Sequence, residues 1–145
     1  LNSPNIKMSK SHASTRGHSV KLLDDPKEIS RSFMRAVTDS DNEIGFSSDP
    51  KKAGVNNLLS IYQVITKKSK SEVEKDFSDA RGYGDLKKRV AEVVIDELTP
   101  IRERYHELMT NPDELDKILA LGSEKASEIA EPKINEMKYN IGFIT

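Results

Sequence analysis

The chain has 145 residues, of which 35% are hydrophobic and 32% charged, and its formal net charge at pH 7 is −1. This length is sufficient for one domain with a hydrophobic core, and the small net charge means that any nucleic-acid contact must come from local basic patches. Cysteine is absent, which excludes disulfides and thiolate chemistry and fits a reducing, cytoplasmic location. The apolar runs are too short to cross a bilayer, and no signal peptide is visible.

The start of the chain is predicted to be a polar loop over residues 1–21, because no apolar period is sustained there. A helix is expected next, since Asp25 can serve as its N-cap, Pro26 suits the first helical position and Glu28 the third. Apolar residues at spacings of three and four predict one buried face on this helix, formed by Ile29, Phe33, Met34 and Val37.

Residues 38–52 are rich in Asp, Ser, Gly and Pro and are predicted to form a second loop. A helix over residues 54–65 is expected to bury Val55, Leu58, Leu59, Tyr62 and Ile65. Ser71 and Glu74 fit a capping box, which predicts a short helix that carries Val73 and Phe77 inward.

The longest helix is predicted over residues 85–110, after a break at Gly82 and Gly84, and Pro100 is expected to kink it. Its apolar stripe comprises Leu86, Val90, Val93, Val94, Ile101, Tyr105, Leu108 and Met109. A further helix is expected from residue 111, with Leu115, Ile118, Leu119 and Leu121 inward. Gly122 is predicted to end or weaken it, and Pro132 to kink or break its continuation to about residue 139. The predicted fold is an all-α bundle of five or six helices behind a long polar loop.

Two pentapeptides of similar composition occur in the chain, KMSKS at residues 7–11 and KKSKS at residues 67–71. The second is explained as a solvated connection that ends in a helix cap. The first lies in a loop with no cap to explain its serines, and its two lysines and two hydroxyls are groups that can bind a polyphosphate. A solvated loop would still be the default interpretation of five such residues alone.

The segments that follow KMSKS argue against this default interpretation. They are LLDDPKEI (residues 22–29), AVTDS (36–40), GVNNLLSIY (54–62), GYGDLKKRVAEVV (82–94) and LTPIRERY (98–105). In order and spacing they resemble the bacterial tryptophanyl-tRNA synthetases, class I aminoacyl-tRNA synthetases whose signature loop is KMSKS. The resemblance covers nearly the whole chain.

The resemblance implies an enzyme that activates tryptophan with ATP and Mg²⁺ and passes it to tRNA(Trp). It implies that Lys10, supported by Lys7, stabilises charge on the leaving pyrophosphate. Ser9 and Ser11 would bond phosphate oxygens or brace the loop, and Met8 would pack. One departure is His12-Ala13-Ser14, where the family commonly continues with Asp-Pro, so the closed geometry of the loop is in question.

In the resembling enzymes the Rossmann-fold catalytic domain precedes the signature loop, and no such α/β region is seen in this sequence. We therefore expect a C-terminal part that is inactive alone and works with an N-terminal catalytic half, in a homodimer. Residues 1–24 would be the signature loop and its connection, and residues 25–145 the helical linker and anticodon-binding domain. The resemblance also makes basic helix residues candidates for tRNA contact, against the alternative of a solvated mixed-charge face: Lys87, Lys88, Arg89, Arg102 and Arg104.

Two other functions stay open. The chain could be the corresponding part of a tyrosyl-type synthetase, or a free-standing helical interaction module in which KMSKS is incidental. A metal site is not expected, because His12, His18 and His106 lack ligand-like spacing. No Ser–His–Asp grouping suggests nucleophilic catalysis.

Overall fold

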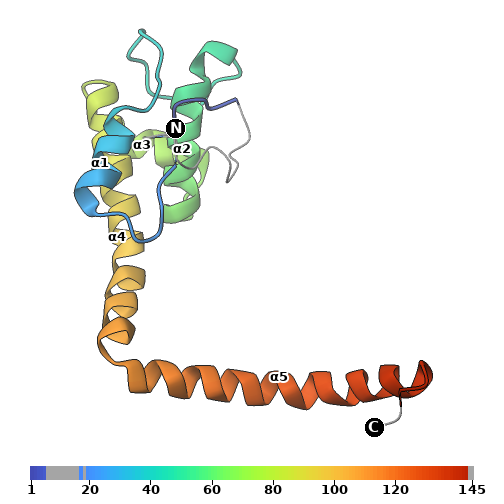
Figure 1. Cartoon of the computed structure of the whole chain (residues 1–145). Helices are drawn as coiled ribbons and strands as arrows, with labels where there is room; N and C mark the ends of the chain where they lie inside the picture. Colours follow the sequence, from blue (N-terminus) through green and yellow to red (C-terminus); the bar gives the residue numbers. More distant parts are fainter. Residues whose placement is uncertain (6–16, 18, 144–145) are drawn as a thin grey trace. The chain divides into compact units, whose positions relative to one another are not determined.

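The computed structural model describes residues 1–5, 17 and 19–143. Its elements are α1 (Pro26–Met34), the 3₁₀-helix η2 (Pro50–Lys52), α2 (Ala53–Thr66), α3 (Lys70–Asp76), α4 (Tyr83–Thr110) and α5 (Pro112–Asn140) (Figure 1). Within the described residues there is no strand, so the predicted all-α class is confirmed. No helix in this part of the chain is long and apolar enough to cross a membrane.

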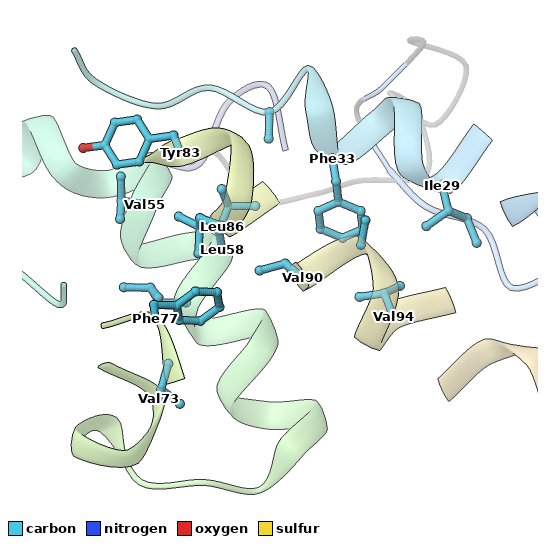
Figure 2. Close-up of a cluster of buried hydrophobic side chains, with 13 residues drawn as sticks. Ile29, Phe33, Val55, Leu58, Val73, Phe77, Tyr83, Leu86, Val90 and Val94 are labelled. Carbon is cyan, nitrogen blue, oxygen red and sulfur yellow. The ribbon is translucent and has the colours of Figure 1, made fainter. Parts of the chain in front are cut away.

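The chain divides into two compact units, Leu1–Arg102 and Glu103–Thr145. The first unit contains the hydrophobic core, to which α1, α2, α3 and the first half of α4 contribute (Figure 2). Figure 2 shows these side chains converging, with the ring of Tyr83 at the edge of the cluster and its hydroxyl directed away from it. Among the described residues, seven hydrophobic side chains are completely or almost completely buried, each stabilising the fold by about 1.5–3 kcal/mol: Ile29, Val55, Leu58, Leu59, Val73, Leu86 and Val90.

Helix α1 begins as predicted but ends earlier. The Asp25 carboxylate accepts a hydrogen bond from the Lys27 backbone N–H at 2.8 Å, which makes Asp25 the N-cap. The helix ends at Met34, and the side chains of Met34 and Val37 are each 48% exposed, so their predicted burial is wrong. Val37 lies beyond the last helical turn and no longer shares a face with Ile29, and Ala36 is buried instead.

Helix α3 is capped by a different serine from the predicted one. The Ser69 hydroxyl accepts a hydrogen bond from the Glu72 N–H, and the Glu72 carboxylate accepts one from the Ser69 N–H at 2.9 Å. The predicted cap, Ser71, is the second residue of the helix. Both serines fit the same pattern, and the fold selects Ser69 because the Glu74 carboxylate is used elsewhere, accepting the Phe46 N–H at 3.0 Å. The KKSKS segment is thus a basic connection that contains a helix cap, as predicted, but the cap is Ser69, two residues before the predicted Ser71.

Helix α5 is continuous from Pro112 to Asn140, so an end at Gly122 and a break at Pro132 are wrong, whereas a weakened helix at Gly122 and a kink at Pro132 stay predictions. A Cβ at Gly122 would meet no atom within 4 Å, so no close packing demands a glycine there. A glycine costs a helix about 1 kcal/mol and a proline about 3 kcal/mol, and the flanking helix-forming residues offset both. Helix α4 continues through Pro100, as predicted, and the kink expected there stays a prediction.

After Pro100, most of the apolar residues predicted to face inward on α4 and α5 are exposed, and Leu108 and Leu115 are half-buried. The side chains of six residues are between 41% and 60% exposed: Ile101, Tyr105, Met109, Ile118, Leu119 and Leu121. Helical spacing tells which residues share a face but not whether another element covers that face. The stripe of α4 is buried only up to about Leu98, where the core of the first unit ends.

Candidate functional site

The signature pentapeptide, residues 7–11, lies outside the described residues, as do His12, Arg16 and His18. The structure does describe the segments on both sides of it, residues 1–5 and 19–24. Leu1 from the first segment and Val20 from the second both pack against the hydrophobic core. Both flanking segments therefore contact the core of the first unit.

These two segments line one side of a pocket of about 490 Å³, and α1, α2 and α4 line the other. The flanking segments contribute Leu1, Ser3, Pro4, Ser19, Val20 and Leu22, and the helices contribute Phe33, Asn57, Ile61, Ile65, Val94 and Leu98. Most of this lining is apolar, and two of its residues, Leu1 and Val20, also pack against the hydrophobic core.

The segment before the pentapeptide is also held by the backbone of the AVTDS motif. The Val37 N–H donates a hydrogen bond to the Leu1 carbonyl at 3.3 Å. On its other side Val37 lies against the second residue of α2, Gly54. A Cβ built on Gly54 would lie 2.0 Å from the Val37 carbonyl oxygen, far inside contact distance, so only glycine fits this approach.

Two residues further on, Asp39 joins a buried polar cluster. The Tyr83 hydroxyl donates a hydrogen bond to Asp39 Oδ1 at 2.5 Å, and the Lys52 ammonium lies 3.4 Å from both groups. Lys52 is 5% exposed and also lies 3.4 Å from the Asp41 carboxylate. We call Val37, Asp39, Lys52, Gly54 and Tyr83 the Val37 anchor. It joins three of the sequence motifs, AVTDS, GVNNLLSIY and GYGDLKKRVAEVV, at one place in the fold.

The hydrogen bonds of the anchor stabilise one pattern of ionisation. The bond from Tyr83 lowers the pKa of the Asp39 carboxyl more than burial raises it. Burial is the largest single effect and lowers the pKa of Lys52, but the bonds to Tyr83, Asp39 and Asp41 together outweigh it and raise that pKa above its usual value. Burial, together with the charge of Asp39, raises the pKa of Tyr83. At neutral pH the cluster is a charged Asp–Lys pair bridged by a neutral phenol.

Sequence reasoning missed this cluster. Lys52 stands beside Lys51 in a segment predicted to be a polar loop, and a buried lysine is rare unless it is paired. The available signal was that AVTDS and Gly82–Tyr83–Gly84 belong to the motifs that carry the family resemblance. Neither motif reveals its partner without the fold.

The residues predicted to contact tRNA differ in the hydrogen bonds and ion pairs that their side chains already form within the chain. Arg89 donates two hydrogen bonds of 2.8 Å to the Asp79 carboxylate and one of 2.7 Å to the Asp76 carbonyl, and its guanidinium lies over the Phe77 ring. These contacts join α4 to the end of α3, so Arg89 has a structural role.

Arg102 donates to the Asp24 carbonyl at 3.2 Å and to the Thr99 hydroxyl at 2.8 Å. In the second unit, Arg104 forms ion pairs with Glu107 and Glu114 at 2.7 and 2.6 Å. Both arginines therefore have partners within their own unit.

The two lysines are more available for an external anion. The Lys88 side chain is 72% exposed and lies 3.9 Å from the Glu92 carboxylate, a separation typical of a weak surface pair. Lys87 is half-buried, and burial lowers its pKa.

The net charge differs between the two units. Residues 1–102 contain 18 Lys and Arg and 15 Asp and Glu, a net charge of +3, whereas residues 103–145 contain 5 and 9, a net charge of −4. The basic side chains that can attract a phosphate backbone thus prevail in the first unit. Across the described residues no group of His, Asp and Glu is arranged to hold a metal ion.

Comparison with known proteins places these features in a family. The family model of tRNA synthetases class I (W and Y) matches residues 1–99, which include all of the Val37 anchor. The chain therefore belongs to the class I tRNA synthetases of the tryptophan and tyrosine type.

Its relatives within that family are tryptophan–tRNA ligases. The chain is 45% identical to the tryptophan–tRNA ligase of Leifsonia xyli subsp. xyli over 144 residues, which are 99% of the chain and 42% of the relative. It is 44% identical to that of Oceanobacillus iheyensis over 142 residues, 98% of the chain and 42% of the relative. The crystal structure of tryptophanyl-tRNA synthetase from Mycoplasma pneumoniae is similar with a TM-score of 0.77 and 25% identity, over 98% of this chain and 42% of that one. The chain thus spans about two fifths of the length of the relatives it matches.

Proposed function

We propose that the chain is the C-terminal part of a tryptophan–tRNA ligase. Such an enzyme joins tryptophan to ATP, forming tryptophanyl-adenylate and pyrophosphate, and then transfers tryptophan to tRNA(Trp). The observation that carries this proposal is the identity of 45% to a tryptophan–tRNA ligase across 99% of the chain. The first unit would hold the signature segment in place, and the helical region of residues 25–145 would serve as linker and anticodon-binding domain.

In this proposal Lys10 and Lys7 act on the leaving group of the first step. A tryptophan carboxylate oxygen bonds to the α-phosphorus of ATP, the bond from that phosphorus to the bridging oxygen breaks, and negative charge collects on pyrophosphate. A lysine ammonium placed at the β- and γ-phosphates stabilises that charge as it develops. Ser9 and Ser11 donate to phosphate oxygens, and Met8 packs beside them.

ATP and tryptophan are proposed to bind mainly to an N-terminal catalytic half of the same protein, and Mg²⁺ enters as the ion of ATP. We therefore expect the chain alone to be inactive, and the complete protein to work in the cytoplasm as a homodimer.

The direct test is exchange of labelled pyrophosphate into ATP in the presence of tryptophan. The chain would be assayed alone and joined to its catalytic half, with Lys10→Ala as the active-site variant. Lys70→Ala is the matched control, since Lys70 occupies the equivalent position of the second pentapeptide at the start of α3. We expect activity only in the complete protein, a loss of about 100-fold or more for Lys10→Ala, and no more than a twofold change for Lys70→Ala.

Three outcomes would contradict the proposal. Exchange catalysed by the chain alone would show that it is not a supporting part. Exchange that depends on tyrosine rather than tryptophan would assign the chain to the tyrosyl-type synthetases, an assignment that its similarity to tryptophan–tRNA ligases does not favour. Equal activity of Lys10→Ala and the unchanged protein would remove the role of that lysine.

For tRNA contact we propose Lys88 and Lys87 ahead of Arg89, Arg102 and Arg104, because the three arginines already bond within the chain. Removing a lysine that contacts a phosphate weakens binding for all sequences and lowers the slope of log affinity against log salt by about one. Lys88→Ala is expected to do this, and Lys133→Ala on α5, where Lys133 pairs with Glu136, is a control of the same charge change. An unchanged salt slope for Lys88→Ala would exclude the contact.

A further inference from the structure

We propose that a polar pocket beside α2 binds the phosphate backbone of tRNA. The pocket has a volume of about 470 Å³, and we call it the Lys70 pocket after the charged residue in its described lining: Phe46, Ser47, Ser48, Asn56, Ser60 and Lys70. The proposal rests on the proposed function and deepens it, because it gives tRNA a contact site that the basic residues of α4 do not include.

The stretch of chain that contains α2 is basic without interruption. Residues 50–71 contain five lysines and neither aspartate nor glutamate, although charged residues make up 32% of the whole chain. Two of these lysines have partners, since Lys52 is buried beside Asp39 and Lys68 pairs with Asp76 at 2.6 Å. The other three are exposed: Lys51, Lys67 and Lys70. Exposed lysines without carboxylates between them attract a phosphate backbone.

The Lys70 ammonium is held at the pocket without losing its charge. It lies 5.0 Å from the centroid of the Phe46 ring, and within the described residues it forms no ion pair. A cation over an aromatic face keeps its full charge, and its N–H donors stay available on the open side. The hydroxyls of Ser48 and Ser60 are exposed at the same pocket. An ammonium and hydroxyls are the groups that proteins direct at phosphate oxygens.

Hydrogen bonds from two helices fix the loop that forms the rest of the pocket. The Ser47 N–H donates to Asn56 Oδ1 of α2 at 3.0 Å, and the Asn56 side-chain amide donates back to the Ser47 carbonyl. On the side of α3, the Phe46 N–H donates to the Glu74 carboxylate at 3.0 Å. The pocket is therefore formed before a ligand arrives, which lowers the entropic cost of binding.

The carboxylates of α3 that follow the pocket in sequence are bonded to groups of the chain itself. Glu72 accepts a hydrogen bond from the Ser69 backbone N–H at 2.9 Å. Asp76 pairs with Lys68, and Glu74 holds the loop. These carboxylates keep their negative charge, so attraction of a phosphate backbone needs the exposed lysines on both sides of α2 to act together.

The spread of the exposed lysines favours a polymer over a small anion. Lys51 precedes α2 and Lys67 follows it, and the 14 residues of that helix are about 21 Å long. A single phosphate or pyrophosphate cannot reach both ends, whereas a nucleic-acid strand carries a phosphate at every nucleotide. Among the proposed substrates, tRNA is the one that carries such a strand.

The test measures binding of tRNA(Trp) to the complete protein over a series of KCl concentrations. Lys70→Ala removes the ammonium from the pocket. Lys75→Ala is the matched control, since Lys75 is an exposed lysine of the same helix that does not line the pocket. We expect Lys70→Ala to weaken binding about three- to fivefold at low salt and to lower the slope of log affinity against log salt by about one. Lys75→Ala should change the affinity less than about twofold.

A second variant adds a carboxylate to the pocket and removes no lysine. Ser60 is exposed on α2, and glutamate favours a helix more than serine does, so Ser60→Glu is expected to fold, with Tm as the check. It should weaken tRNA binding at least as much as Lys70→Ala. The difference from the unchanged protein should shrink as the salt concentration rises, because salt screens the added charge.

Three outcomes would overturn the proposal. The first is an equal effect of Lys70→Ala and Lys75→Ala on affinity and salt slope, whether that effect is small or large. The second is unchanged tRNA binding by a folded Ser60→Glu protein. The third is that pyrophosphate, added at the same ionic strength as KCl, abolishes the difference between Lys70→Ala and the unchanged protein, which would assign the pocket to a small anion.

Failure of this proposal can be told from failure of the proposed function. A complete protein without tryptophan-dependent pyrophosphate exchange refutes the function itself. A complete protein that is active in exchange and binds tRNA(Trp), with no difference between Lys70→Ala and Lys75→Ala, refutes the pocket alone. Because pyrophosphate exchange proceeds without tRNA, a role of Lys70 in tRNA binding agrees with its use as a control in that assay.

Discussion

Replacing Gly54 with alanine tests the packing of α2 against the AVTDS segment most sharply. The added Cβ would lie 2.0 Å from the carbonyl oxygen of Val37, 2.9 Å from its carbonyl carbon and 3.4 Å from Thr38 Cα. All three are backbone atoms, so no side-chain rotation can relieve the contact. The start of α2 or the segment around Val37 must shift by more than 1 Å to reach an ordinary contact distance.

The expected cost follows from two opposing effects. Forcing an extra carbon into a packed site usually costs 1–3 kcal/mol, and backbone contacts on both sides put this site at about 3 kcal/mol. Alanine is about 1 kcal/mol better than glycine inside a helix, which offsets part of this. The net loss of unfolding free energy is therefore about 2 kcal/mol, which lowers Tm by about 8–16 °C in a unit of this size.

Thermal unfolding followed by circular dichroism is the measurement, and Gly84→Ala is the control. Gly84 is the second residue of α4, as Gly54 is of α2, but a Cβ on Gly84 meets nothing within 4 Å. Gly84→Ala should leave Tm unchanged or raise it by a few degrees. If Gly54→Ala is as stable as Gly84→Ala, the close approach of α2 to Val37 is not present in solution, and the Val37 anchor loses one of its two supports.

Three further predictions concern the core, a cap and the pH dependence of stability. Leu58→Ala should cost about 2–5 kcal/mol of unfolding free energy in urea titration, whereas Ile129→Ala, at a side chain 80% exposed on α5, should stay within about 0.5 kcal/mol; similar losses for both would contradict the described core. Ser69→Ala should cost about 1 kcal/mol by the same titration and Ser71→Ala almost nothing, and the reverse order would restore the capping box at Ser71. The pKa of Asp39 is lowered in the folded chain, so the stability that its carboxylate contributes is present above the unfolded pKa near 4 and is lost as pH falls through the folded pKa. The Asp39→Asn variant should therefore lose less Tm on acidification than the unchanged protein. Identical dependence of Tm on pH in the two proteins would show that Asp39 does not contribute.

Much of the fold could be predicted because its signals are local. The N-cap at Asp25 and the apolar spacings in α2 and at the start of α4 located these helices and most of their buried side chains. The errors also have a common physical origin. Met34 and Val37 share a helical period with buried residues but lie at and beyond the end of α1, and period alone does not tell where a helix stops.

The candidate site could be predicted only in part. The pentapeptide and the motifs after it indicate the family, and the match of the family model to residues 1–99 agrees with that interpretation. The residues that hold the flanking segment, above all Lys52 and Tyr83, could not be predicted. A lysine in a polar segment and a tyrosine between two glycines have no local feature that points to a shared carboxylate.

By itself the sequence determined the helical class of the chain, most of its helices, the inward positions of α2 and the relationship to tryptophan–tRNA ligases. Helix periods and caps involve residues three or four apart, and family motifs are read directly from the residue order. Only the tertiary structure decided which serine caps α3, where the buried stripe of α4 ends, and that Asp39 meets Lys52 and Tyr83. Those contacts join residues 13 and 44 positions apart, and such pairs form only when packing of the whole core brings their elements together.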